Sequence, residues 1–453
     1  MDETRLIKPL LDKDYPIISH GDGIYLYDTN GKKYLDGSSG AITASIGHGV
    51  PEIIDEMERQ AKKISFVYRS QFTSEPAERL ASKLSDLAKG KYGGYWSFFV
   101  NSGSEATETA MKIAIQYWQE KGIKGKNKIL SRWMSYHGIT IGALSMSGHS
   151  ARRARFVSLL EDYPTISPPY CFRCPYNASY PSCNHMCAFE LEQAINRIGE
   201  EHIAAFIAEP IIGAAGGAIV PPAGYYQVIK KICEKHNIIF IADEVMTGIG
   251  RTGKMFALEH WDTNADIIAL GKGMSAGYTP IAATLVSEKV MEPIKAGSKL
   301  IMSGHTYSAN PQSAAVALAV LEFIEKNSLV EAAEKNGEYL LLKLQDLQRK
   351  YPIIGEVRGK GMMCGIELVS DMITKFPFKK ELDVTGLLVS IAQSNGLLLY
   401  PAAAGIAGVG GDAILVAPPL TTTTSQIDEL IHLLDKTLSD IDKELQVTGV
   451  TIA

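Results

Sequence analysis

The chain has 453 residues, of which 46% are hydrophobic and 21% charged, so it can bury a large core in one domain or two intertwined domains. Its formal net charge of −5 provides no broad basic surface, which argues against nucleic-acid binding and favours small-molecule partners. No basic segment followed by an apolar run opens the chain, and no stretch of about 18 uncharged apolar residues follows. We therefore expect a cytoplasmic protein with no membrane contact.

The first two thirds of the chain alternate between strand-like and helix-like segments. Residues 23–35 are expected to form a hairpin, because apolar residues flank an Asn-Gly pair that favours a tight turn. Helical periodicity covers residues 51–64, 75–88 and 104–121. Short apolar runs (SFFV, AAFIAE, IIFIAD, DIIALG) accompany the helices, which is typical of a largely parallel sheet covered on both faces. The sequence therefore predicts an α/β fold.

The pattern changes after residue 308. A long helix precedes two strand candidates, EVRGKGMMCGIEL and AILVAPPL, and a final helix is expected over residues 425–444. We interpret this as a smaller α+β domain built from both chain ends. The expected boundaries are 1–60 for the N-terminal segment, 61–320 for the large domain and 321–453 for the C-terminal small domain.

A possible phosphate site is the first chemical feature. The segment NSGSE, from Asn101, follows an apolar strand and opens a helix, so its free N–H groups and the helix dipole point outward together. Gly103 lets the backbone approach a ligand closely, and Ser104 provides a cap and a hydroxyl. An ordinary capped helix is the alternative.

Two further strands end in groups that a cofactor could use. IIFIADEV ends with Asp243 at the carboxyl end of a predicted parallel strand, where a carboxylate could hold a protonated ring nitrogen such as that of pyridoxal phosphate. ADIIALGKG delivers Lys272 between two glycines, where a partly desolvated amine could form an imine. Taken alone, Asp243 could equally cap a turn or pair with an arginine, and Lys272 could be a surface lysine.

Two weaker segments belong to the same set. Tyr136 opens a YHG segment soon after the KILSR strand, where its ring could cover a flat cofactor or simply pack in the core. Thr306 lies in GHTYSANP, a loop whose hydroxyls suit a phosphate or the closing of a turn.

In order and spacing, NSGSEATETAMKIA, YHG, AEP, DEVMTGIGRTGKMFA, LGKGMSAGYTP and GHTYSANP resemble the class III aminotransferases, pyridoxal-phosphate enzymes of the aspartate-aminotransferase fold. The resemblance runs from about residue 23 to about residue 418, nearly the whole chain. It implies a large domain with a mostly parallel seven-stranded sheet that binds pyridoxal 5′-phosphate.

The resemblance also implies roles for individual residues. Lys272 would be the catalytic residue, holding the cofactor as a Schiff base, while Asp243 would pair with the ring nitrogen. Val245 would pack beneath the ring and Tyr136 above it. Thr306 would reach the phosphate of the neighbouring subunit's cofactor, which implies a homodimer, with pairing of dimers into a tetramer left open. The implied cofactor-binding residues are Gly103, Ser104, Tyr136, His137, Glu209, Asp243, Val245, Lys272 and Thr306.

The implied activity is ping-pong transfer of an amino group from a primary amine or ω-amino acid, including a taurine-like sulfonate, to a 2-oxo acid such as pyruvate or 2-oxoglutarate. A racemase, epimerase or aminomutase on the same fold is the alternative, because it would share the lysine without net exchange of amino groups. A non-catalytic cofactor-binding regulator would need an extra N-terminal domain, for which a hairpin near residue 23 leaves no room.

The sequence departs from many relatives at positions expected to contact substrate. Tyr400 and Leu415 stand where many relatives carry an arginine for a substrate carboxylate, Ala214 replaces a gating glutamate, and Ile42 replaces a tryptophan. A 2-oxo acid would therefore need another cation. The candidates are Arg69, Arg152, Arg153 and Arg155.

Four of the six cysteines lie in one loop, CFRCPYNASYPSCNHMC. The paired spacing of Cys171, Cys174, Cys183 and Cys187 resembles a zinc knuckle, with His185 as a further candidate ligand. A reduced, metal-free loop near the pocket entrance is the favoured interpretation, because disulfides are rare in the cytoplasm. No metal is assigned to the catalytic site.

Overall fold

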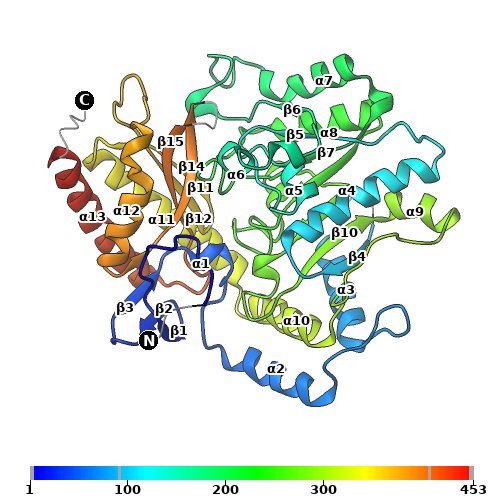
Figure 1. The fold of residues 1–453 in the computed structure, drawn as a ribbon, viewed down its shortest axis with the longest axis horizontal. Coiled ribbons are helices and arrows are strands. Elements are labelled where there is room, and N and C mark those ends of the chain that lie inside the picture. Colours follow the sequence, from blue (N-terminus) through cyan, green and yellow to red (C-terminus); the bar gives the residue numbers. More distant parts are fainter. Residues whose placement is uncertain (1–4, 90–92, 407–409, 448–453) are drawn as a thin grey trace.

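The computed structural model describes residues 5–89, 93–406 and 410–447, which form a larger and a smaller part (Figure 1). A seven-stranded sheet with the order β4-β10-β9-β8-β7-β5-β6 is the centre of the larger part. Strand β10 is antiparallel to both neighbours, and the other pairs are parallel. The predicted α/β fold with a mostly parallel seven-stranded sheet is confirmed. Its strands are β4 (Tyr95–Val100), β5 (Lys128–Arg132), β6 (Thr165–Ile166), β7 (Ile203–Ala208), β8 (Ile239–Asp243), β9 (Ile267–Leu270) and β10 (Ala282–Ser287).

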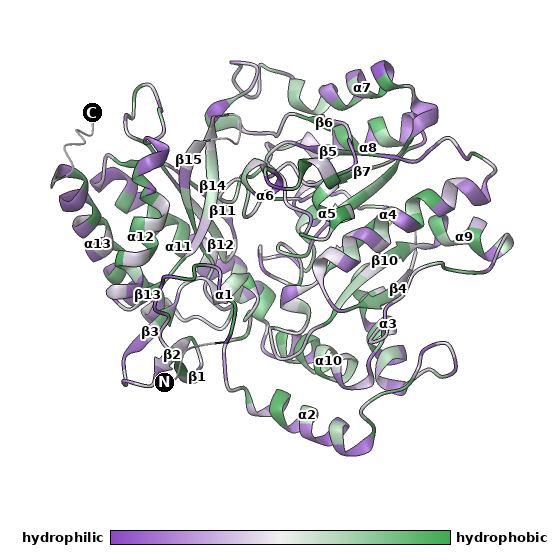
Figure 2. Cartoon of the chain, in the orientation of Figure 1, coloured by the Kyte–Doolittle hydropathy of each residue, from purple (hydrophilic) through white to green (hydrophobic). Residues whose placement is uncertain are grey.

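The central strands are buried along their whole length and are mostly apolar, because helices cover both faces of the sheet. Successive side chains point to opposite faces, so Phe206 and Phe240 join one core cluster while Ile207 and Ile241 join the other. Figure 2 shows the same hydrophobic character along the sheet and the inner sides of the helices.

The helices lie close to where their periodicity predicted them, with one correction. The long helix expected after residue 308 is two helices, because Ser328 adopts a left-handed conformation (φ +49°) between them. The α-helices are α1 (Ser39–Ile42), α2 (Pro51–Lys63), α3 (Glu75–Leu87), α4 (Gly103–Glu120), α5 (Ile141–Met146), α6 (Ser150–Arg153), α7 (Met186–Ile198), α8 (Tyr225–Lys235), α9 (Glu288–Ala296), α10 (Pro311–Lys326), α11 (Leu329–Lys350), α12 (Val384–Ser394) and α13 (Thr424–Val447).

The smaller part joins the two ends of the chain. The N-terminal strands β1, β2 and β3 continue into β13, and Figure 1 shows these blue strands beside the orange and red C-terminal elements. Ile24 and Leu35 share a core cluster with Leu340 and Leu430, which confirms a smaller domain built from both ends. The boundaries at residues 60 and 320 stay a prediction. The strands are β1 (Ile18–Asp22), β2 (Tyr25–Asp28), β3 (Lys33–Asp36), β11 (Ile354–Lys360), β12 (Met363–Leu368), β13 (Leu397–Leu398), β14 (Tyr400–Ile406) and β15 (Gly410–Val416).

The topology brings the loops after β4, β5, β7, β8 and β9 to one edge of the large sheet. Because these strands share a direction, their carboxyl ends meet where α/β folds bind ligands. No helix among the described residues has the length and apolar character needed to cross a membrane. The cytoplasmic location stays a prediction.

Candidate active site

A cavity of about 220 Å³ lies at this carboxyl edge. It is lined by Gly103, Ser104, Tyr136, His137, Gly138, Glu209, Asp243, Val245, Met246 and Lys272. The structure therefore brings together every residue of the predicted cofactor-binding set except Thr306. The sequence does not single out Met246, because nothing distinguishes it from an ordinary apolar residue.

Lys272 begins the short turn that follows β9, and it does so with a left-handed backbone (φ +43°) that non-glycine residues seldom adopt. Its Nζ donates a hydrogen bond to the carbonyl oxygen of Ala41 at 2.7 Å. Burial lowers the pKa of Lys272 to about 8, with Asp243 opposing the shift and Arg152 adding to it. An appreciable fraction of the amine is therefore neutral near physiological pH and able to act as a nucleophile.

The contact with Ala41 could not be anticipated from the sequence. Ala41 lies in a tight turn in which Ser39, Gly40 and Ile42 all have positive φ angles (49°, 62° and 57°). This turn directs the Ala41 carbonyl oxygen at the Lys272 amine. Gly40 alone hints at such a conformation, and it does not reveal the partner.

Asp243 ends β8 and is almost fully buried, with 4% of the residue exposed. Its Oδ2 lies 2.7 Å from Nδ1 of His137, and its Oδ1 accepts a hydrogen bond from the Val245 N–H at 3.1 Å. His137 is held in turn by its own N–H, which donates to Ser147 Oγ at 2.8 Å. These contacts fix the direction of the Asp243 carboxylate. A carboxylate that keeps a ring nitrogen protonated needs such a fixed direction.

Glu209 ties two loops of the site together. Its Oε1 accepts a hydrogen bond from the Tyr136 N–H at 2.9 Å, and its Oε2 accepts one from the Gly213 N–H at 3.0 Å. Burial raises the pKa of Glu209, while the nearby His137 opposes the rise. The backbone contacts place Tyr136 at the cavity wall and leave Glu209 as a positioning group.

The start of α4 has the geometry of a capped helix terminus at the edge of the cavity. Ser102 caps the helix by accepting from the Glu105 N–H, and Ser104 Oγ accepts from the Ile139 N–H at 3.0 Å. A Cβ on Gly103 would lie 2.9 Å from Val245 Cγ1, so only glycine lets Val245 pack against this turn. The exposed N–H groups of such a helix start favour a phosphate.

These groups fit pyridoxal phosphate. A helix terminus suits its phosphate, the buried Asp243 suits its ring nitrogen, and the desolvated amine of Lys272 suits its aldehyde. Tyr136 and Val245 contribute an aromatic and an aliphatic side chain to the same cavity. A flat cofactor ring needs such apolar side chains to pack against its two faces.

Thr306 lies outside this group. It is exposed on the loop between α9 and α10, and it does not line the cavity that contains Lys272. Its neighbour His305 has Nδ1 at 3.6 Å from Glu105 Oε1, so the loop sits beside the start of α4. Contact between Thr306 and the phosphate of a neighbouring subunit stays a prediction.

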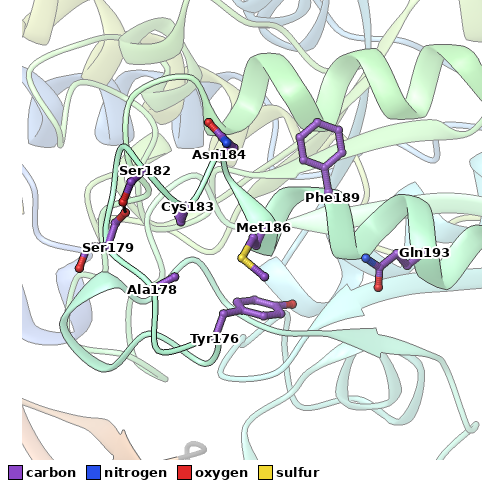
Figure 3. A pocket seen from close by; sticks show the side chains of 9 residues that line it. All are labelled: Tyr176, Ala178, Ser179, Ser182, Cys183, Asn184, Met186, Phe189 and Gln193. Carbon is purple, nitrogen blue, oxygen red and sulfur yellow. Dashed lines mark hydrogen bonds between the residues drawn. The ribbon is translucent and has the colours of Figure 1, made fainter.

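The cysteine loop, residues 168–187, packs beside the cavity. Tyr136 and Phe172 contact the same apolar cluster, which includes Met134 and Tyr170. All four thiols of the loop are free, and burial together with the other cysteines raises the pKa of Cys187 to about 12. Within the described residues, no group of three or more His, Cys, Asp or Glu side chains is placed to hold a metal. Figure 3 shows a pocket in this region that is lined by Cys183 and Met186 together with Phe189 and Gln193 of α7.

Comparisons with known proteins point to one family. The family model for aminotransferase class-III matches residues 12–438. The uncharacterized aminotransferase YodT of Bacillus subtilis is 54% identical over 441 residues, covering 97% of this chain and 99% of that protein. The putrescine–pyruvate aminotransferase of Pseudomonas aeruginosa is 34% identical over 434 residues, covering 95% of this chain and 92% of that protein.

A solved structure is similar over nearly the whole chain. An amine transaminase from an uncultivated Pseudomonas species, determined with pyridoxal phosphate bound, is 33% identical with a TM-score of 0.90 and covers 97% of this chain and 99% of that chain. That neighbour carries the cofactor for which the helix start, the buried carboxylate and the desolvated amine described above are suited.

Proposed function

Since the chain belongs to the class III aminotransferases, which depend on pyridoxal phosphate, we propose that it transfers an amino group from a primary amine or ω-amino acid to a 2-oxo acid such as pyruvate. One observation carries the proposal: the Lys272 amine, with its pKa lowered to about 8, shares a cavity with the buried Asp243–His137 pair. A relative that acts on putrescine and pyruvate supports the choice of substrates.

The residues of the cavity divide the work between binding and proton transfer. Ser104 and the start of α4 would hold the phosphate, and Asp243 would hold the ring nitrogen in its protonated form. Bound pyridoxal phosphate supplies an electron sink for the carbon that loses its proton. The Nζ of Lys272 takes that proton and returns it to a different carbon, which a flexible side chain with a pKa near 8 can do at neutral pH.

Three apolar residues at positions expected to contact substrate support an amine without a carboxylate at its reacting end. Ala214 and Leu415, which stand where relatives carry charged groups, are both buried with at most 3% exposed. Ile42, buried at the tight turn that faces Lys272, adds a branched aliphatic side chain where several relatives have tryptophan. Apolar side chains at these positions suit a methylene chain better than a carboxylate.

We also infer a homodimer in which Thr306 completes the neighbouring site. Large apolar side chains are exposed around the Thr306 loop. The Phe66 and Tyr307 rings meet there edge to face, with their centres 6.1 Å apart. An exposed apolar patch of this kind favours an interface. A measured mass of two chains, and weaker cofactor binding in Thr306→Val, are the expected results. The exposed apolar residues are Phe66, Tyr68, Phe72, Met302 and Tyr307.

The test of the function is an absorbance titration of the cofactor-loaded protein with donors and no acceptor. Putrescine, β-alanine, taurine and alanine are compared, and we expect at least one to convert the cofactor to its amine form with release of one carbonyl product per site. Added pyruvate should then restore the starting spectrum. Substrate racemisation or rearrangement without that conversion, for every donor, would replace the proposal with a racemase or aminomutase.

A further inference from the structure

We propose that Arg152 binds the carboxylate of the 2-oxo acid acceptor. This inference rests on the function proposed above and assigns the cation that the C-terminal domain lacks at Tyr400 and Leu415. Arg152 lies on the short helix α6, close to the wall of the cavity. Its guanidinium carbon is 4.5 Å from the centre of the Tyr136 ring, and Tyr136 lines the cavity that contains Lys272.

The charge of Arg152 is felt inside the cavity. It lowers the pKa of Lys272 and, through both its charge and a hydrogen bond, opposes the rise that burial imposes on the pKa of Tyr136. The side chain is exposed, and in the parts of the chain that the structure describes no carboxylate forms an ion pair with it. Arg152 therefore has both its charge and most of its five N–H donors available for a ligand.

The neighbouring histidine does not compete for this role. His149 meets the Tyr136 ring edge-on, with ring centres 6.3 Å apart. Burial, and then the charge of Arg152, lower the pKa of His149 to about 4. His149 is therefore neutral at physiological pH, and Arg152 supplies the positive charge above Tyr136.

The other arginine whose charge lowers the pKa of Lys272 already donates its hydrogen bonds to backbone carbonyl groups. Arg251 is buried, and its guanidinium donates to the carbonyl oxygens of Met362 at 3.1 Å and Pro418 at 2.5 Å. These bonds join the large domain to the C-terminal segment, so Arg251 has a structural role and cannot turn toward a substrate.

Two other candidates from the sequence are also committed. Arg153 Nη1 donates to three backbone carbonyl oxygens at 2.8–3.1 Å, including that of Leu144. Arg69 Nη2 donates to the carbonyl oxygen of Ser303 at 2.5 Å, and its guanidinium lies over the Phe98 ring. Arg155 is exposed, and the charges that contribute most to the pKa of Lys272 do not include it.

The position of the Arg152 guanidinium over the Tyr136 ring suits a carboxylate. A guanidinium that lies on an aromatic face directs its N–H edge sideways, in the plane where a carboxylate can accept two parallel hydrogen bonds. Tyr136 thus fixes the orientation of Arg152 before substrate arrives, which reduces the entropy lost on binding. A carboxylate or sulfonate at the far end of an ω-amino donor could use the same group in the other half-reaction.

The experiment measures the two half-reactions separately in the cofactor-loaded enzyme, with putrescine as a donor that has no negative charge. Arg152→Gln should lower the second-order rate constant for pyruvate roughly 10- to 100-fold, the value of one charge-assisted interaction, while the putrescine half-reaction changes less than about threefold. The preference for pyruvate over its neutral analogue pyruvamide should disappear. Arg152→Lys should recover part of the loss, since it keeps the charge but not the fork.

Arg155→Gln is the matched control, because it removes an exposed arginine from the same segment. It should leave both half-reactions as in the parent enzyme. An unchanged ratio of pyruvate to pyruvamide reactivity in Arg152→Gln would overturn the assignment and direct attention to a cation of the neighbouring subunit.

A binding measurement separates failure of this inference from failure of the proposed function. Lactate resembles pyruvate but has a hydroxyl in place of the reactive ketone, so calorimetry reports carboxylate binding without turnover. Its dissociation constant should rise roughly 10- to 100-fold in Arg152→Gln and stay constant in Arg155→Gln. Equal lactate binding in the parent and Arg152→Gln proteins rejects the carboxylate site even if transamination is established. A difference confirms it even if no donor in the panel reacts.

Discussion

The floor of the cavity and the loop beside it are held in place by different forces. On the floor, Asp243 and Glu209 lie at or just after the ends of buried strands, and each accepts hydrogen bonds from backbone N–H groups of the following loops. The cysteine loop is instead held by side chains that converge on Glu367 of β12. Glu367 accepts from Tyr170 Oη, from Arg173 Nε at 2.7 Å and from Arg358 Nη1 at 2.7 Å.

This difference assigns proton transfer to the cavity floor and access to the cavity to the cysteine loop. Floor residues cannot move without distorting the seven-stranded sheet, so they provide the fixed geometry that proton transfer needs. The loop can shift if one carboxylate is lost, because three side chains depend on Glu367. Changes on the floor should therefore affect turnover with little effect on stability, and changes at Glu367 should do the reverse.

The largest expected effect is at Lys272. Lys272→Ala should still bind pyridoxal phosphate through the helix start and Asp243, but turnover should fall by about 10³-fold or more because the proton carrier is missing. Loss of the covalent link should be visible as release of the cofactor on dialysis without denaturant. Near-parent turnover in a sample verified by mass spectrometry would contradict the assignment.

Asp243→Asn should have the next largest effect, a fall in turnover of about 10²-fold with the fold intact, because an amide cannot hold the ring proton electrostatically. Glu244→Gln is a matched control at the adjacent position. Glu244 is also buried, and burial raises its pKa to about 7, but it contacts Thr247 and the Leu258 N–H and does not line the cavity. Similar losses in both variants would mean that Asp243 acts only through packing.

Glu367→Gln should destabilise the packing of the cysteine loop and leave the residues of the cavity floor in place. Arg358 and Arg173 keep only 9% and 10% of their side chains exposed, so loss of the shared negative charge leaves two buried cations poorly compensated. We expect a loss of about 3 kcal/mol in unfolding free energy and faster alkylation of the loop cysteines. Glu356→Gln, at the more exposed end of the same network, should cost clearly less. Thermal denaturation and timed thiol labelling measure both effects, and equal costs would contradict the central role of Glu367.

The same division explains which features were predictable from the sequence. Asp243, Lys272 and Gly103 follow strands whose apolar runs are visible in the sequence, and parallel topology brings strand ends to one edge. Their mutual proximity could therefore be anticipated, as could the seven-stranded sheet.

Contacts between distant segments could not be anticipated. The carbonyl of Ala41 reaches Lys272 across 231 positions, and Tyr170 reaches Glu367 across 197. Neither pairing follows from periodicity or spacing, because each depends on how the smaller part docks against the larger. The position of Arg152 above Tyr136 belongs to the same class, and the sequence could offer it only as one of four candidates.

The smallest expected effect is a change in the pKa of Lys272 caused only by the charge of Arg152. Because the Arg152 cation lowers the pKa of Lys272, Arg152→Gln should raise that pKa, whereas Arg155→Gln should not. In cofactor-free protein the neutral amine reacts with an acylating reagent, so labelling of Lys272 should increase with pH around a midpoint near 8 in the parent. The midpoint should move upward in Arg152→Gln, by less than about one pH unit because Arg152 is exposed and screened by salt. Peptide mapping by mass spectrometry isolates the signal of Lys272 from that of other lysines. A midpoint that does not move, or moves downward, would mean that the charge of Arg152 does not influence the Lys272 amine.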